Sequence, residues 1–99
     1  MNVRGVWVPP GATAETEAAV CWYRERSATA AKRLVAEINE TIDRILESPQ
    51  RWPAGFRGTR KVKVPCFPFL VIYRESHNTL AVLAIAHGRR RPGYWKGRA

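Results

Sequence analysis

The chain has 99 residues, of which 17 are Lys or Arg and 8 are Asp or Glu, so its formal net charge is +9 and its pI is near 10.6. The excess is confined to one half: residues 1–50 net −1 (six basic, seven acidic side chains), and residues 51–99 net +10 (eleven basic, one acidic). The length suits one domain over residues 1–99, and a hydrophobic content of 45% excludes a disordered basic tail. The apolar runs are too short for a membrane span and no apolar signal segment is evident, so a cytoplasmic protein is expected.

The N-terminal residues are expected to form an edge strand followed by a helix. Val3–Val8 is β-branched and aromatic, and Pro9-Pro10-Gly11 is expected to break the chain after it. Thr13 is predicted to cap the helix, because Glu15 and Glu17 then fall in its first turn, beside the positive end of the helix dipole. Helical spacing predicts an apolar face made of Ala14, Ala18, Cys21 and Trp22.

A second helix is predicted to begin at Ser27 or Thr29 and to end before Pro49, since the residue before a proline is disfavoured in the α region. Its apolar stripe consists of Ala31, Leu34, Val35, Ile38, Ile42, Ile45 and Leu46. Because only two or three residues join the two helices, they are expected to form an antiparallel hairpin.

After a loop over Gln50–Thr59 the hydrophobic period changes to two, which predicts strands. The first of these strands has one face in solvent, and its inward positions are Val62, Val64 and Cys66. Phe69–Arg74 and Leu80–His87 are nearly all apolar, so they are expected to be central strands. Ser76-His77-Asn78 is predicted to form the hairpin turn between them.

The tail Gly88–Ala99 is basic and aromatic without clear periodicity, and it is expected to be flexible. No internal repeat or low-complexity tract interrupts the order of the elements before it. The order β-α-α-β-β-β predicts an α+β domain, in which the helical hairpin packs on one face of a small, mostly antiparallel sheet.

Basic side chains from three predicted strands and the tail are expected to converge at one concave end of the sheet: Arg60, Lys61, Lys63, Arg74, His87, Arg89, Arg90 and Arg91. Clustered cations bind polyanions, since they attract phosphate and release condensed counterions. Tyr94 and Trp95 follow the arginines, and aromatic rings beside a basic groove stack on bases. The alternatives are a solvated basic face and, for Arg74, an ion pair with Glu75 or with a helix carboxylate.

His87 ends an apolar strand and shares the sequence parity of Leu83 and Ile85. It is either a core-edge histidine bonded to the backbone or a proton donor or acceptor, because imidazole titrates near neutral pH. The spacing of His and Cys residues fits no zinc site and no glycine-rich phosphate loop occurs, so neither a metal nor a cofactor is expected. The isolated Cys21 and Cys66 are expected to be buried small hydrophobes.

Six segments occur in a recognisable order: Glu15–Tyr23, Ile45–Pro53, Arg60–Val62, Phe67–Phe69, Ile72–Arg74 and Ala84–Pro92. Together they resemble the motifs of the RelE/ParE toxin superfamily over nearly the whole chain, and the ordered set is more specific than any one segment. Two features depart from the family pattern, since Thr16 stands where a leucine is usual and the stretch Pro9–Ala12 is one residue longer than usual.

The resemblance implies the toxin of a type II toxin–antitoxin module, similar to plasmid-stabilisation proteins. It also implies a cognate antitoxin whose acidic, amphipathic C-terminal segment wraps the toxin in a hetero-oligomer and neutralises it. A basic, concave receiver suits such a partner. The helix hairpin and any open sheet edge are plausible docking surfaces, with Val3–Val8 the first candidate.

The superfamily divides by target, and two branches are open for this chain. The ParE-like branch, which inhibits DNA gyrase, is favoured because Ile85-Ala86-His87 and Tyr73-Arg74 resemble it. The RelE-like branch cuts mRNA in the ribosome, and on this chain its catalytic roles would fall to Lys61, Lys63, Arg74, His87 and Tyr94. In either branch, contact with the target is expected from Arg60, Arg89, Arg90, Arg91 and Trp95. A third reading, from charge alone, is a non-catalytic nucleic-acid-binding module.

Overall fold

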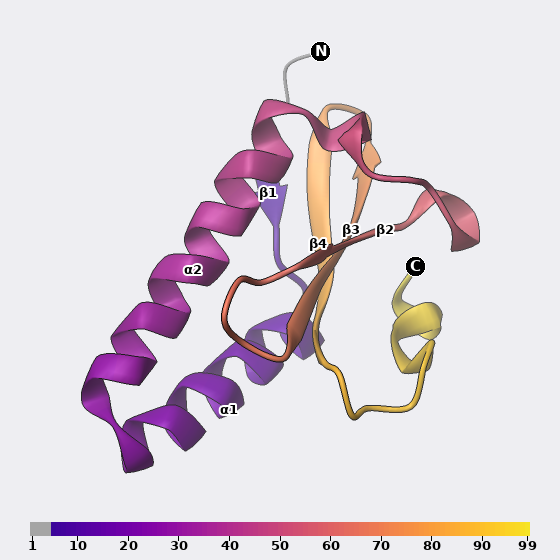
Figure 1. Cartoon of the computed structure of the whole chain (residues 1–99). Coiled ribbons are helices and arrows are strands. Elements are labelled where there is room, and N and C mark those ends of the chain that lie inside the picture. Colours follow the sequence, from indigo (N-terminus) through magenta and orange to yellow (C-terminus); the bar gives the residue numbers. More distant parts are fainter. Residues whose placement is uncertain (1–4) are drawn as a thin grey trace.

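The computed structural model describes residues 5–99 and shows two helices against one face of a four-stranded sheet (Figure 1). The elements in chain order are β1 (Gly5–Trp7), α1 (Pro10–Arg26), α2 (Ala28–Glu47), the 3-10 turns η1 (Pro49–Arg51) and η2 (Phe56–Gly58), β2 (Arg60–Lys63), β3 (Phe69–Ser76), β4 (Thr79–His87) and the 3-10 helix η3 (Tyr94–Arg98). The strand order is β1-β4-β3-β2, with β1 parallel to β4 and the other pairs antiparallel. The predicted α+β class is confirmed, and the described part of the Val3–Val8 strand lies at a sheet edge; its first two residues fall outside the described range.

Helix α1 begins at Pro10, so the predicted break at Pro9-Pro10-Gly11 and the predicted Thr13 cap are wrong. Proline suits the first helical position because its fixed φ is already helical and its missing N–H would have no partner there. The Thr13 N–H donates to the Pro9 carbonyl at 3.0 Å, which places Thr13 inside the helix. Glu15 and Glu17 consequently lie beyond the first turn.

The buried face of α1 is also not the predicted one. Ala12 and Ala19 are the buried residues of the helix, whereas Ala14, Ala18 and Cys21 are exposed and Trp22 is 51% exposed. Successive helical residues differ by about 100°, so a face displaced by one residue turns Trp22 into solvent and Glu15 towards the sheet. Both thiols are exposed, so the prediction that they are buried is wrong. Cys21 lies on the outer side of α1, and Cys66 lies in a turn with a φ of 68°.

Helix α2 follows the sequence pattern closely. The Ser27 hydroxyl accepts a hydrogen bond from the Ala30 N–H at 3.1 Å and is the N-cap, which is one of the two predicted starts, and the helix ends two residues before Pro49. Leu34, Ile38 and Ile45 are buried on its inner face, whereas Val35, which was predicted to belong to the apolar stripe, is 40% exposed. No helix in the described part of the chain is long and apolar enough to cross a membrane.

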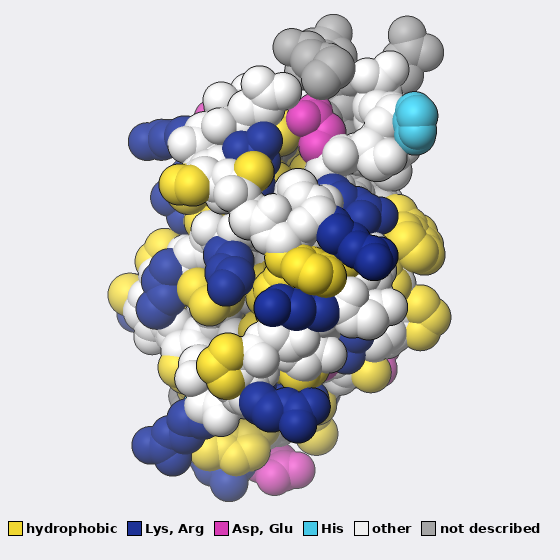
Figure 2. All heavy atoms as spheres, turned by 90° about the vertical axis from the view of Figure 1, so that its right-hand side faces the viewer, with side chains coloured by type: hydrophobic (Ala, Val, Ile, Leu, Met, Phe, Trp, Pro, Cys, Tyr) yellow, Lys and Arg dark blue, Asp and Glu magenta, His cyan; other side chains and the backbone are white. Residues whose placement is uncertain are grey.

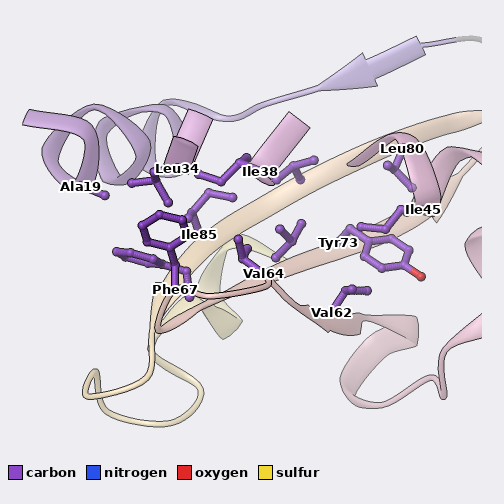
Figure 3. Packing of buried hydrophobic residues seen from close by; sticks show 13 residues of the cluster. Ala19, Leu34, Ile38, Ile45, Val62, Val64, Phe67, Tyr73, Leu80 and Ile85 are labelled. Carbon is purple, nitrogen blue, oxygen red and sulfur yellow. The ribbon is translucent and has the colours of Figure 1, made fainter. Parts of the chain in front are cut away.

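The main core lies between the helices and the sheet (Figure 3), where side chains of α2 meet inward side chains of β2, β3 and β4. Val62 and Val64 point into it as predicted, although β2 ends at Lys63. The central strands β3 and β4 are joined by the predicted turn, in which His77 and Asn78 both have positive φ, 49° and 64°. Two left-handed residues form the hairpin turn whose twist matches that of the strands.

The opposite face of the sheet is covered by the C-terminal residues. Trp95, from η3, is 3% exposed and packs with Ile72, Leu83, Ala84 and other outward residues of β3 and β4. The tail without periodicity therefore supplies the second apolar layer, and β3 and β4 are apolar throughout because both of their faces are covered.

Candidate functional site

The strand register separates the basic residues that were predicted to converge. Arg74 pairs with Ala81 and His87 pairs with Phe69, so the two positions are six residues apart along β4. At ~3.3 Å per residue this is roughly 20 Å. Arg60 pairs with Tyr73, next to Arg74, and belongs to the same end of the sheet. The predicted convergence on one end is therefore wrong, because the register separates Arg60 and Arg74 from His87.

The faces of the sheet separate the residues further. A bulge between Ile72 and Tyr73 of β3 leaves Leu83 of β4 unpaired. Leu83 consequently joins the outer cluster while Ile85 stays in the inner core, so the parity that His87 shares with Leu83 in sequence is lost in the fold. Lys61 and Lys63 lie on the outer face, because their partners Ile72 and Leu70 pack in the outer cluster.

Two of the predicted target-binding or catalytic cations are held by main-chain oxygens. The Arg60 guanidinium donates to the Trp52 carbonyl and, at 3.5 Å, to the Gln50 carbonyl, which fastens the loop before β2. The Lys63 ammonium donates to the Val64 carbonyl at 2.8 Å and to the Phe67 carbonyl, across the turn after β2. Both side chains stabilise turns in this structure.

Arg74 is half-buried on the outer face. The ion pairs within residues 5–99 are Arg98–Glu15 and Arg26–Glu25, so Arg74 lacks the pairing with Glu75 or a helix carboxylate that was one alternative. Lys61 is exposed, and its ammonium lies 5.7 Å from the centre of the buried Trp95 ring.

His87 lines a pocket of about 360 Å³ between α1 and the end of β4. Its Nδ1 accepts a hydrogen bond from the Arg89 N–H at 3.0 Å, and its ring packs edge-on against Phe69 with centroids 5.3 Å apart. The predicted backbone-bonded core-edge histidine is thus present. The pocket is completed by residues of α1 and the tail: Glu15, Ala18, Ala19, Trp22, Tyr23, Arg90 and Tyr94, with Phe69 and Ile85 from the sheet.

Glu15 is the centre of the hydrogen-bond network beside this pocket. Its carboxylate accepts from the Tyr94 hydroxyl, from the Arg98 guanidinium at 2.9 Å and from the Ile85 N–H at 3.2 Å. Arg98 also donates to the Leu83 carbonyl at 3.1 Å. The Glu15 side chain is 13% exposed and that of Arg98 29%. The pair thus connects α1, β4 and η3.

This network satisfies a part of β4 that has no neighbouring strand on the side of β1. Among the described residues, β1 pairs with β4 only from Thr79 to Ala81. Beyond that point Glu15 supplies the acceptor for the Ile85 N–H, and Arg98 supplies the donor for the Leu83 carbonyl. Buried main-chain groups need such partners, so the ion pair replaces the missing strand.

The sequence interpretation missed both members of this pair. It assigned Glu15 to the helix dipole because it placed the helix start too late, and it gave Arg98 no role. A correct helix start would have put Glu15 on the face of Ala12 and Ala19, where a carboxylate needs a basic partner.

Tyr94 is held as a hydrogen-bond donor. Burial raises the pKa of its hydroxyl to about 12, and the hydrogen bond to Glu15 acts in the same direction. The Arg90 guanidinium lies 4.0 Å from the centre of its ring, whereas Arg89 and Arg91 are exposed on the turn before η3. Within residues 5–99, no group of three or more His, Cys, Asp or Glu side chains is placed to hold a metal ion.

Comparisons with known proteins agree with this fold. The model of the ParE toxin of the type II toxin–antitoxin system parDE matches residues 8–92. A solved structure described as the chromosomal ParDE TA system from P. aeruginosa superposes with a TM-score of 0.73 at 18% identity, covering 86% of this chain and 96% of that one. No curated protein matches the sequence. Since the family model spans most of the chain, the protein belongs to the ParE toxin family of type II toxin–antitoxin systems.

Proposed function

We propose that this ParE-family protein inhibits DNA gyrase and that a cognate antitoxin neutralises it. Membership of the family supports the proposal. The observation that favours gyrase over mRNA cleavage is the position of Tyr94: its hydroxyl is bound to Glu15, with a pKa of about 12. A tyrosine in that state is a poor general base near neutral pH.

The other residues that the ribonuclease reading requires are also dispersed. That reading needs a proton carrier beside cations that stabilise a charged phosphate in the transition state. His87 lies on the inner side of the sheet end, Lys61 on the outer face, and Arg74 about six residues along the strands from His87, roughly 20 Å at ~3.3 Å per residue. The arrangement therefore supports a toxin that acts by binding.

Neutralisation is proposed to use β1 and the adjoining surface. Among the described residues β1 pairs on one side only, and Val6, Trp7 and Val8 are 42%, 57% and 40% exposed. An added strand would satisfy the free main-chain groups, and its apolar side chains would cover these residues. Carboxylates of an acidic segment would complement the net charge of +9.

The direct test is a supercoiling assay with purified gyrase, relaxed plasmid and ATP, run beside a ribosome translation assay with a defined mRNA. We expect loss of supercoiling and accumulation of cleaved DNA, both abolished by the antitoxin encoded next to the toxin gene, with the mRNA intact. Intact gyrase activity together with codon-positioned cuts in the mRNA would reject the proposal in favour of the RelE-like mechanism. Inactivity in both assays, with harmless induction, would favour a basic nucleic-acid-binding module.

Two variants sharpen the distinction. His87→Ala and Tyr94→Phe should keep gyrase inhibition, provided that circular dichroism and antitoxin binding show that they fold. A ribonuclease would lose cleavage in both variants, because these residues are its candidate proton carriers.

A further inference from the structure

A second groove lies on the face opposite the helices, between the loop before β2 and η3. Its volume is about 470 Å³, and its chemistry comes from Phe56, Arg60, Lys61, Trp95 and Lys96. Figure 2 shows this side of the molecule, where Lys and Arg side chains alternate with apolar ones. The hypotheses above assign Arg60, Lys61 and Trp95 to target contact or catalysis, but none of them includes Phe56 or Lys96.

The groove places cations around an exposed aromatic ring. Phe56 is 41% exposed, and the Lys96 ammonium and the Arg57 guanidinium lie 4.9 and 5.4 Å from the centre of its ring. The Trp95 ring meets Phe56 edge-on at 6.4 Å, with Lys61 at 5.7 Å from Trp95. Three cations, Arg57, Lys61 and Lys96, thus lie within about 6 Å of the centre of the Phe56 or the Trp95 ring.

Within residues 5–99 no Asp or Glu side chain pairs with these cations, and Arg57 donates to the Ala99 carbonyl oxygen at 3.5 Å. Glu75 is the only acid in residues 48–99, and it pairs with Leu80 near the turn between β3 and β4. The ion pairs within residues 5–99 involve neither Arg57 nor Lys61 nor Lys96. Like charges gathered without counter-charges produce a positive potential that attracts an anionic ligand.

The loop that carries Phe56 is fixed by its own backbone. Arg57 and Gly58 both have positive φ, 50° and 77°, and the Gly55 N–H donates to the Thr59 carbonyl at 2.7 Å. The Thr59 hydroxyl donates to the Phe56 carbonyl at 2.6 Å. Because the turn is closed in this way, Phe56 is presented to solvent before any ligand arrives.

We propose that this groove binds single-stranded nucleic acid, with a base stacked on Phe56 and the flanking phosphates on Lys61, Lys96 and Arg57. Stacking requires an unpaired base, which a duplex does not offer, and an acidic peptide would use the cations but not the ring. A base that stacks on Phe56 would displace Arg57 or Lys96 from the ring, and the displaced cation would then contact the phosphate of the same nucleotide. The proposal is independent of gyrase as the target, since it concerns nucleic acid alone.

The test measures fluorescence anisotropy of a labelled twelve-residue oligothymidylate with the purified full chain, over a range of salt concentrations. Phe56→Leu keeps an apolar side chain without a ring and should weaken binding about tenfold. Lys61→Gln and Lys96→Gln should each make the negative slope of log K against log salt shallower by about 0.7. Lys32→Gln removes the same charge from an exposed position on α2 and should change neither measurement.

The alternatives give different results. Equal losses in Lys32→Gln and Lys96→Gln, with none in Phe56→Leu, would mean attraction by net charge alone and would overturn the proposal. So would a duplex of the same length that binds as tightly as the single strand, or a polyglutamate peptide whose binding depends equally on Phe56. Because gyrase is absent, failure here leaves the supercoiling result intact, and the reverse also holds.

Discussion

Replacing Glu15 by alanine should destabilise the protein more than any other substitution of a carboxylate in α1. The change removes the acceptor for three donors at once, namely the Tyr94 hydroxyl, the Arg98 guanidinium and the Ile85 N–H. It also leaves the part-buried Arg98 without its counter-charge, since Arg98 then keeps only the Leu83 carbonyl. Removing one member of such a pair is unfavourable because the other charge remains desolvated.

The size of the effect follows from the exposure of the groups. Hydrogen bonds to charged groups contribute about 1.5–3 kcal/mol each, and an unsatisfied buried donor costs about 1–3 kcal/mol. Arg98, at 29% exposure, can turn partly to water, so the loss is below the sum of three such bonds. We expect about 3 kcal/mol for Glu15→Ala and about 1 kcal/mol for Glu15→Gln, which keeps an acceptor for the Ile85 N–H.

Urea unfolding followed by circular dichroism measures this difference. Thermal unfolding is the second measurement, and in a domain of this size about 3 kcal/mol lowers the midpoint temperature by roughly 12–24 °C. Glu17→Ala is the matched control, because Glu17 is an exposed residue of the same helix, and it should change stability by about 0.5 kcal/mol or less. If Glu15→Ala proved no more destabilising than Glu17→Ala, the role assigned to the ion pair would be refuted.

Three further predictions concern stability. Burial raises the pKa of both Tyr73 and Tyr94 from 10 to about 12. The stability that the two neutral hydroxyls contribute is therefore complete below pH 10 and is lost as the pH rises to about 12. Replacing both residues by Phe should make the urea midpoint less dependent on pH between pH 10 and about pH 12. Ser27→Ala removes the N-cap of α2 and should cost about 1 kcal/mol, against no change for Ser27→Asp. Leu34→Ala opens a cavity at a fully buried core position and should cost about 3 kcal/mol by chemical denaturation; a loss below ~1 kcal/mol would contradict the packing described.

Local patterns were sufficient for the helix hairpin and the central strands. The stripe of α2, its start at Ser27 and the turn at His77-Asn78 depend on neighbouring residues. The turn was predicted correctly, Ser27 was one of the two predicted starts, and the stripe was correct except for Val35, which is 40% exposed. Periodicity failed on α1, because an alanine-rich helix offers little contrast between its faces. Its helical spacing placed Trp22 inside, although the buried residues of the helix are the small Ala12 and Ala19.

The candidate site depended on contacts that no local pattern contains. The bulge opposite Leu83 reverses the parity of β4, and the register places Arg74 and His87 at different ends of the sheet. The buried position of Trp95 depends on a chain reversal after His87 that brings η3 back over the outer face. Charge counts located the basic half of the chain correctly, but the positions of its members required the fold.

The short length of β1 connects the Glu15–Arg98 ion pair, the open sheet edge and the groove beside Trp95. Because β1 covers β4 only as far as Ala81, the rest of that edge is closed from within by Glu15 of α1 and Arg98 of η3. An added strand therefore finds free main-chain groups on the outer side of β1 rather than along the second half of β4. The same ion pair holds η3 in place, and η3 carries Trp95, which lines the groove beside Phe56. Glu15→Ala should therefore weaken oligothymidylate binding, although Glu15 does not line that groove. Unchanged binding by a folded Glu15→Ala variant would show that Trp95 alone holds η3 in place.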